Sequence, residues 1–350
     1  MTLFFSLLSI LLILITALYQ QLPTFILALG YGWWHNHAKK RWIFRFLAID
    51  AFIVFIVLDP SMNCIIATAI PFAALFVFSL INANSNVFAA LDESHILKQK
   101  ELIYDLETEI VGYCDPSGAS ICYPIDEIVM PRHLINDTFN GNPLFISYCA
   151  ACRSTMIYNP MVLGTRLTFE VIGVYRRNMV IGDLQTKTLW QQGTGEAMCG
   201  ALKGKQLEYF AYQQMKLGDW LKEYPDSFIA QEHPSAPKGL LPKKRIMKAM
   251  KVTDSFIGPG RTELNGLPLR EKVWGLELNG KSKAYPVSEL KKSKGLSDNV
   301  GGTEIRITYN PDTNQIDGEI TETTEALRFQ NHWWFGWKEF HPETDIWKFQ

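Results

Sequence analysis

Long runs of apolar residues stand near the start of the chain and predict helices that cross a membrane. Three runs that are poor in charge are LFFSLLSILLILITALY (3–19), WIFRFLAIDAFIVFIVL (42–58) and CIIATAIPFAALFVFSLI (64–81). A run of this length can cross the apolar layer of a bilayer as a helix. The polar stretch DPSMN between the last two runs allows only a tight connection. We therefore predict a membrane segment over residues 1–85, with spans at about 3–19, 42–58 and 64–81.

Two features of this segment bear on how it is built. A secretory signal peptide is the alternative for the first run, but no basic residue precedes it as such a peptide would require. The stretch TFILALGYGWW (24–34) is too short to span, and it ends in Trp33 and Trp34. Paired tryptophans are typical of the membrane interface, so we expect these two rings at headgroup level.

The apolar runs downstream are short and are broken by Gly, Pro and Asn. This pattern predicts a mostly β domain with a few helices, of class α+β, over residues 95–350. In LIYDLETEIVGYCDPSGASICYPIDEIVM, the residues DPSG between two apolar runs predict a turn between two strands.

The β-rich domain contains an internal repeat. VGYCDPSGASICYPIDEI (111–128) parallels WGLELNGKSKAYPVSEL (274–290), and NDTFNGNPLFISYC (136–149) parallels SDNVGGTEIRITYN (297–310). The matching residues keep a nearly constant register, which predicts a duplicated strand–hairpin–helix–strand unit at about 108–158 and 271–318. The first unit ends in YCAAC where the second has YNPDT. A cysteine pair in only one unit indicates a local task rather than a need of the scaffold.

Charge changes this picture in two ways. The net charge of -1 at pH 7 gives no electrostatic basis for nucleic-acid binding. Lys39, Lys40 and Arg41 precede the second run, so the positive-inside rule places that loop in the cytoplasm of a bacterial inner-membrane protein. The following hairpin would return the domain to the same side. If the second run lies in the interface instead, the domain would be periplasmic.

A basic stretch offers a further contact with lipid. KGLLPKKRIMKAMK (238–251) holds six basic residues among Leu, Ile and Met. It is either a solvated connecting segment or a patch that lies on the anionic cytoplasmic leaflet. The lipid bilayer is thus the only partner that the sequence indicates. The sequence does not identify a small-molecule or protein partner.

The chain has six cysteines, of which Cys149 and Cys152 form a C-x-x-C pair. This spacing suits either a redox dithiol or two ligands of one metal ion. The pair follows one predicted strand and precedes another, so it lacks the helix N-terminus that lowers a thiol pKa in thioredoxin-type motifs, although Arg153 could stabilise a thiolate. Two thiolates alone would suit Cu(I), and mixed sulfur and nitrogen ligands would suit Zn. Candidates for further ligands are His133, Cys199, His332 and His341.

At these residues the sequence resembles the bacterial and archaeal family catalogued as domain of unknown function 3179. The resemblance covers roughly residues 105–350. Its matching residues are Tyr123-Pro124, Asn136-Asp137, Tyr148-Cys149-x-x-Cys152, Phe169, Gly173, Asp183, Leu189-Trp190-x-Gln192, Gly195, Gly200, Trp220, Pro225 and Phe335-x-Trp337-x-x-Phe340-x-Pro342-x-Thr344. The resemblance implies a domain that is usually exported or attached to a membrane, and it carries no established reaction.

The resemblance supports a role for Cys149 and Cys152, and it adds Asp183, Trp190 and Gln192 as residues expected to line a site between the repeats. Two hypotheses follow. The first is a membrane-anchored protein whose Cys149 and Cys152 perform thiol redox chemistry or bind a metal such as Zn or Cu, with His341 as a third ligand. The second is a non-catalytic tethered binding or accessory module, whose cysteine pair holds a structural metal or is inert. The sequence does not decide whether the protein is an enzyme.

Overall fold

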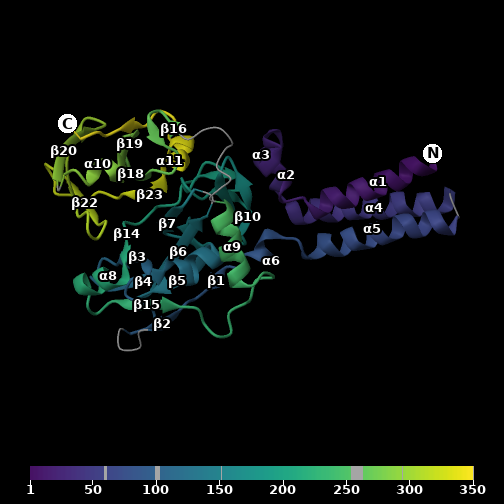
Figure 1. The fold of residues 1–350 in the computed structure, drawn as a ribbon, viewed down its shortest axis with the longest axis horizontal. Helices are drawn as coiled ribbons and strands as arrows, with labels where there is room; N and C mark the ends of the chain where they lie inside the picture. Colours follow the sequence, from purple (N-terminus) through teal and green to yellow (C-terminus); the bar gives the residue numbers. More distant parts are fainter. Residues whose placement is uncertain (59–60, 99–102, 151, 254–262, 294, 350) are drawn as a thin grey trace.

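The computed structural model describes residues 1–58, 61–98, 103–150, 152–253, 263–293 and 295–349. A helical segment projects from a β-rich domain, and the N-terminus lies at the far end of that projection (Figure 1). The connection expected at 59–63 falls partly on residues 59–60, which lie outside the described residues.

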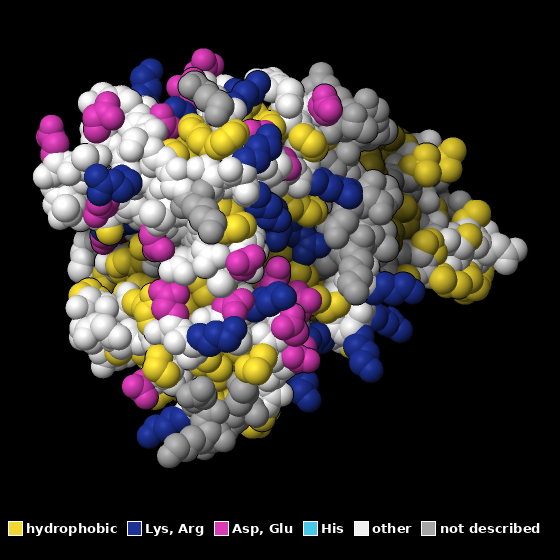
Figure 2. Space-filling model, turned by 60° about the vertical axis from the view of Figure 1, so that its left-hand side comes forward, with side chains coloured by type: hydrophobic (Ala, Val, Ile, Leu, Met, Phe, Trp, Pro, Cys, Tyr) yellow, Lys and Arg dark blue, Asp and Glu magenta, His cyan; other side chains and the backbone are white. Residues whose placement is uncertain are grey.

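Three helices of the first segment pack side by side: α1 (Thr2–Ala17), α4 (His37–Leu58) and α5 (Met62–Ile81). Ile13, Ala48 and Phe72 form the buried contact between them. Hydrophobic side chains gather on the outside of this segment (Figure 2). An apolar exterior of this kind is unusual for a surface that faces water.

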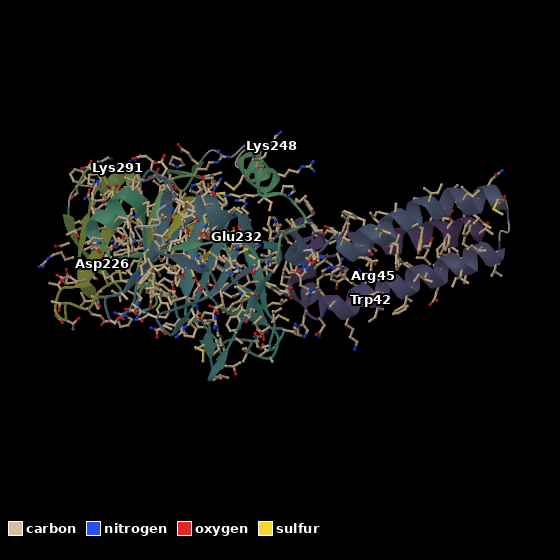
Figure 3. The ribbon with its side chains drawn as sticks, turned by 90° about the horizontal axis from the view of Figure 1, so that it is seen from below. Trp42, Arg45, Asp226, Glu232, Lys248 and Lys291 are labelled. Atoms are coloured by element: carbon tan, nitrogen blue, oxygen red, sulfur yellow. The ribbon has the colours of Figure 1, made fainter. Side chains whose placement is uncertain are left out.

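Only α5 among the described helices is both long and apolar enough to cross a membrane. The sequence predicts three spans, and two of them fall short for different reasons. The apolar helix α1 has 16 residues, and α4 carries Arg45 and Asp50 within its apolar run and Arg41 directly before it. Arg41 and Arg45 turn inward to α5, where Arg45 Nε donates to Ser79 Oγ at 3.1 Å. Arg45 also lies over the Trp42 ring, with 4.6 Å between its Cζ and the ring centroid (Figure 3).

The stretch expected at headgroup level instead docks onto the β-rich domain. It forms α2 (Leu22–Phe25), a 3-10 turn η1 (Leu27–Leu29) and α3 (Gly30–Trp34). Trp34 is wholly buried, and its ring fills the space where a side chain at Gly173 would begin. The Trp34 ring is therefore buried within the protein and not exposed on its surface.

The described residues of the β-rich domain form five sheets in a propeller-like arrangement, together with two short hairpins. Three sheets lie before residue 232. They have the strand orders β14–β3–β4–β15–β2, β1–β5–β6–β7 and β10–β11–β12–β13. Their bounds are β1 Leu91–Asp92, β2 His95–Leu97, β3 Glu109–Cys114, β4 Ser120–Pro124, β5 Leu134–Phe139, β6 Asn142–Cys149, β7 Ser154–Tyr158, β10 Phe169–Tyr175, β11 Asn178–Asp183, β12 Leu189–Gln191, β13 Ala197–Cys199, β14 Gln213–Lys216 and β15 Phe228–Gln231.

The other two sheets have the orders β23–β18–β19–β24 and β20–β21–β22. Their bounds are β18 Lys272–Leu278, β19 Lys281–Pro286, β20 Gly295–Val300, β21 Thr303–Tyr309, β22 Ile316–Ile320, β23 Gln330–Trp333 and β24 Asp345–Ile346. The short hairpins and helices are β8 Met161–Val162, β9 Thr165–Arg166, β16 Glu263–Leu264, β17 Leu267–Pro268, α6 Asn84–Val87, η3 Ile125–Val129, α7 Met130–Arg132, α8 Leu217–Glu223, α9 Lys243–Thr253, α10 Val287–Leu290 and α11 Trp334–Phe340.

The internal repeat is visible in the strand pairing. The hairpin β3–β4 corresponds to β18–β19, and the meander β5–β6–β7 corresponds to β20–β21–β22. One hydrogen bond recurs with the same length in both: Tyr123 Oη donates to Asp137 Oδ2 and Tyr285 Oη donates to Asp298 Oδ2, each at 2.9 Å.

The repeat also extends beyond the predicted units. The segment β14–α8–β15 corresponds to β23–α11–β24, because each adds an antiparallel strand, a short helix and a parallel strand to its hairpin. In both, a tryptophan ring covers a strand glycine: Trp220 over Gly112 and Trp337 over Gly275. We call residues 109–231 copy one and 272–346 copy two. Copy one contains an additional sheet, β10–β13, called the inserted sheet, and this insertion hides the rest of the repeat from a fixed-offset comparison.

Candidate functional site

Cys149 and Cys152 lie in the turn of a hairpin in copy one. Cys149 ends β6 and pairs with Ser154 at the start of β7, so the two cysteines flank a reversal of the chain. Residue 151 lies outside the described residues. Arg153 has a φ of 55°, which lets the chain enter β7. Since β7 follows the pair, the turn has no helix N-terminus to lower a thiol pKa, as the sequence predicts.

Copy two covers this turn. Trp333 N donates to Cys152 O at 3.1 Å, which joins β23 to the backbone of the turn. A side chain at Gly336 in α11 would begin 2.6 Å from Cys152 Cβ, so only glycine fits there. Cys152 is 0% exposed and Cys149 is 1% exposed. None of the six cysteines forms a disulfide bond.

Asn178 of the inserted sheet donates a hydrogen bond to the Cys152 sulfur. Its Nδ2 lies 3.1 Å from Cys152 Sγ. The orientation of this amide is settled by the backbone, because Gly193 N donates to Asn178 Oδ1 at 3.0 Å. An N–H group can only donate, so the Asn178 oxygen faces Gly193 and its nitrogen faces the sulfur.

Gln192 and Ser154 complete the polar surroundings of Cys152. Ser154 Oγ lies 3.1 Å from Cys152 Sγ and donates to Gln192 Oε1 at 2.9 Å. Gln192 Oε1 also accepts from Asn178 Nδ2 at 3.1 Å, and Gln192 Nε2 donates to Ser147 Oγ at 3.1 Å. All of these side chains are buried. A buried and fully connected network of this kind holds its members in one geometry.

The network reverses the usual effect of burial on a thiol. Burial by itself would raise the pKa of Cys152, but its neighbours Cys149, His332 and Ser154 lower that pKa well below its usual value. Cys122 provides the contrast within the same domain. It is equally buried, and burial alone raises the pKa of its thiol. The neighbours of Cys152, rather than its depth, therefore favour the thiolate.

Of the four candidate ligands beyond the cysteine pair, His332 is the one associated with Cys152. It lies on β23 and is 1% exposed. His341 packs more closely on the Trp337 ring, at 3.8 Å between ring centroids, than His332 does, at 5.4 Å. Burial and His332 lower the pKa of His341 to about 3, so its 3.3 Å contact with Glu277 is made by a neutral imidazole.

The predicted lining residues separate into two groups. Gln192 belongs to the network around Cys152. Asp183 instead closes the turn after β11, where its Oδ2 accepts from Thr188 N at 3.1 Å and from Trp190 Nε1 at 3.0 Å. Trp190 shares the apolar cluster that contains Cys149 and Cys152, and its polar atom is directed to Asp183. Asp183 and Trp190 thus support the inserted sheet.

Arg153, which the sequence offers as a partner for a thiolate, is directed elsewhere. Its Nη1 donates to Tyr148 Oη at 2.9 Å, and its guanidinium lies 5.4 Å from the Trp333 ring centroid. Sequence reasoning also missed Asn178, Ser154 and Gly336. None of these stands in a pattern that marks chemistry, and each acquires its place only when the inserted sheet and α11 close over the turn.

The described residues contain no group of three His, Cys, Asp or Glu side chains that could hold a metal ion. In particular, His341 does not join Cys149 and Cys152 in such a group. Cys149 instead forms part of the lining of a cavity of about 210 Å³ between the helical segment and the domain. The two cysteines therefore differ in access: Cys152 is enclosed by protein, and Cys149 borders an internal space.

A comparison with family models matches residues 90–344 to a family described as "Protein of unknown function (DUF3179)". No curated protein and no solved structure matches the chain.

Proposed function

The chain belongs to the DUF3179 family of proteins of unknown function, and we propose that it is a membrane-tethered dithiol–disulfide redox protein whose Cys149 and Cys152 alternate between two thiols and one disulfide. The observation that carries this proposal is the set of groups around Cys152. A wholly buried sulfur is surrounded by an amide donor from Asn178, by Cys149 and by His332. A structural cysteine needs none of them.

The two thiols have separate roles in this proposal. Cys149, which borders the cavity, attacks one sulfur of a substrate disulfide, so that a mixed disulfide forms and one substrate thiolate leaves. The Cys152 thiolate then attacks Cys149 Sγ, which forms the Cys149–Cys152 bond and releases the second substrate thiolate. Two electrons pass from the protein to the substrate, and the departing thiolates take up the two protons of the dithiol. The same steps in reverse reduce the pair.

The helical segment is proposed to hold this domain at a membrane, with all three helices α1, α4 and α5 in the bilayer. Their mutual packing and their exposed apolar exterior support this proposal. Two of the charged groups of α4, Arg41 and Arg45, do not face lipid, because they are buried against α5, whereas Asp50 is exposed. A charged side chain within a span is expected to face the helix bundle in this way.

We further propose that the domain faces the cytoplasm. Lys39 and Lys40 lie at the start of α4, which is its end nearest the β-rich domain. The C-terminal end of α5 lies at the same end of the helical segment. A basic end is retained in the cytoplasm. Lys248 of the basic helix α9 extends outward from the domain (Figure 3), where it could meet anionic lipid.

The exposed thiol of Cys114 provides the test of this orientation. It should resist a membrane-impermeant maleimide in intact spheroplasts, and its labelling there would place the domain outside.

The redox proposal is tested on the full-length protein in detergent. Samples are equilibrated with glutathione buffers of graded redox ratio, unfolded, and labelled with a polyethylene-glycol maleimide that counts thiols by gel shift. We expect two of the six thiols to disappear together as the buffer becomes oxidising. Cys149→Ser and Cys152→Ser should each abolish this step, whereas the control Cys199→Ser should keep it.

Elemental mass spectrometry on the same samples addresses the metal alternative. About one metal ion per chain, lost in the Cys149→Ser/Cys152→Ser variant, would contradict the redox proposal and favour a metal-holding module. Thiols that never pair in any buffer would equally contradict it.

A further inference from the structure

The cavity beside Cys149 is the second feature with chemical meaning. It lies where the ends of α1 and α5 meet the inserted sheet. Its apolar wall includes Phe88, Val171, Val174 and Met179, and its polar groups come mainly from the chain segments next to the membrane helices, at Gln20 and Gln21. Since Cys149 is in the same lining, whatever occupies the cavity lies against its thiol.

Two glutamine side chains leave polar atoms without hydrogen bonds in this lining. Gln20 is 1% exposed, and its Nε2 has no partner, although its Oε1 accepts from Asn84 N at 2.6 Å. That backbone N–H settles the orientation of the amide, so the unpartnered atom of Gln20 is a donor. Gln21 Oε1 likewise has no partner, whereas Gln21 Nε2 donates to Asn84 Oδ1 at 3.2 Å.

The orientation of Gln21 is fixed in the same way. Asn84 Nδ2 donates to the carbonyl oxygen of Ile172 at 2.7 Å, which leaves Asn84 Oδ1 to accept from Gln21. His133, which also lines the cavity, leaves its Nδ1 without a partner, so three residues of the lining each hold one unpartnered polar atom beside apolar walls. A buried polar atom without a partner costs about 1–3 kcal/mol, so their grouping around one cavity indicates a ligand that satisfies at least the two glutamine atoms.

The volume limits the ligand to a small molecule. An apolar cavity of about 150 Å³ accommodates benzene, and this cavity has about 210 Å³. One substituted six-membered ring fits such a space. The position at the base of the helical segment favours a molecule that arrives from the lipid.

We propose that the cavity binds the ring of a membrane-soluble quinone, which accepts the two electrons of the Cys149–Cys152 dithiol. Gln20 Nε2 would donate to a quinone carbonyl oxygen, and Gln21 Oε1 would accept from the hydroxyl group of the reduced ring. This inference rests on the proposed redox function and names the substrate class of that same site.

The reaction balances without another reactant. The Cys149 thiolate adds to a ring carbon of the quinone and forms a carbon–sulfur bond. The Cys152 thiolate then attacks Cys149 Sγ, forms the disulfide, and displaces the ring with the bonding electron pair. The two thiol protons end on the two ring oxygens. One quinone and one dithiol thus become one hydroquinone and one disulfide.

The test uses reduced full-length protein in detergent, with decylubiquinone as the probe. Quinone reduction is followed by ultraviolet absorbance, and the protein thiols are counted in parallel. We expect one quinone reduced per chain, with the loss of two thiols. Gln20→Glu, which keeps the acceptor for Asn84 but replaces the free donor with a carboxylate, should slow the reaction at least tenfold. Val174→Phe, which fills the cavity, should do the same.

Gln185→Glu is the matched control, because Gln185 Oε1 also accepts a backbone N–H, from Thr168 at 2.8 Å, on an exposed turn away from the cavity. It should react at the wild-type rate. The glutathione titration shows whether each variant still forms its disulfide. Quinone that stays oxidised while glutathione still closes the disulfide would overturn the quinone inference and leave the redox function in place. The wild-type rate in Gln20→Glu would also overturn the inference. A glutathione titration without a transition would overturn both.

Discussion

The same hairpin turn occurs twice in this molecule and is given two different environments. In copy two, Asn310 and Asp312 are exposed, and Asn310 Oδ1 accepts from Asp312 N at 3.0 Å, which closes the turn from within. In copy one, the equivalent turn carries Cys149 and Cys152 and is enclosed by β23, α11 and the inserted sheet. The tyrosine before each turn, Tyr148 or Tyr309, is 3% exposed in both. The backbone of the hairpin is thus the same in the two copies. The chemical environment of the turn depends on the elements that cover it.

The strand that covers the turn shows the same division. β14 pairs Met215 with Ile110, and β23 pairs His332 with Val273 in the corresponding register. Copy one therefore has a methionine where copy two has the histidine that contributes to the Cys152 environment. The site combines the turn of copy one with the edge strand of copy two, and neither copy contains it alone.

The largest effect is expected from replacing His332 of copy two with methionine, the residue at the corresponding position of copy one. His332→Met should raise the pKa of Cys152, because it removes the effect of the imidazole that lowers this pKa while roughly keeping the side-chain volume. The measurement is the pH midpoint of thiolate absorbance near 240 nm in the reduced protein. Met215→His is the reciprocal control and should leave the midpoint unchanged. A midpoint that His332→Met does not move would mean that His332 has no part in the site.

A smaller rise in the pKa of Cys152 is expected from Asn178→Ala, which removes one donor to the sulfur. The same change leaves Gly193 N and Gln191 Nε2 without their acceptor. Thermal or denaturant unfolding should show a loss of about 1–3 kcal/mol for these buried groups. If stability falls while the thiolate midpoint stays in place, Asn178 supports the inserted sheet but not the thiolate.

The two tryptophans that cover glycines should behave alike in stability and differently at the site. Trp220 Nε1 donates to Ser227 Oγ at 2.8 Å, and Trp337 Nε1 donates to Thr344 Oγ1 at 2.9 Å. Trp220→Phe and Trp337→Phe should each reduce the free energy of unfolding by roughly 1–3 kcal/mol, through the lost hydrogen bond and the vacated volume. Only Trp337→Phe should shift the Cys152 midpoint, since Trp337 contacts the His332 ring. Equal shifts in both variants would contradict this division.

The smallest effect is expected in the turn of copy two. Asn310→Ala removes the acceptor for Asp312 N on an exposed turn, so unfolding experiments should show a loss of about 0.5–1 kcal/mol. Thiol counts across the glutathione series should equal those of the wild type. A changed count would show that copy two contributes to the chemistry through this turn as well.

The sequence was informative wherever structure follows from local pattern. The apolar runs predicted the helices, and the DPSG turn and the alternating runs predicted the hairpins. The shared Tyr-Pro dipeptide and the aligned Asp, Gly and Tyr positions predicted the repeat. The position of Cys149 and Cys152 between two strands was also predicted correctly, because neighbours in a hairpin are neighbours in sequence.

The surroundings of Cys152 could not be predicted in this way. Asn178 and His332 belong to other sheets, and the influence of His332 rather than His341 on Cys152 depends on how β23 and α11 pack over the turn. Gln192 was identified through the family resemblance. Asp183 and Trp190, identified on the same basis, close a turn instead, because a motif records which residues recur and not which of them touch. Among the described helices, only α5 passes the length and composition test for a membrane span. The helix α1 is too short, and α4 carries charges, of which Arg45 finds its partner Ser79 only once the helices pack.

The central claim is that the neighbouring groups, and not burial, determine the pKa of the Cys152 thiol. Two difference titrations test this claim most directly. Thiolate absorbance near 240 nm is titrated with pH in the reduced wild type, in Cys152→Ser and in Cys122→Ser. The wild-type curve minus each variant gives the midpoint of the missing thiol. We predict that Cys152 titrates well below the ordinary cysteine pKa of about 8.5, and that equally buried Cys122 titrates above it. A Cys152 midpoint at or above the ordinary value would contradict the account.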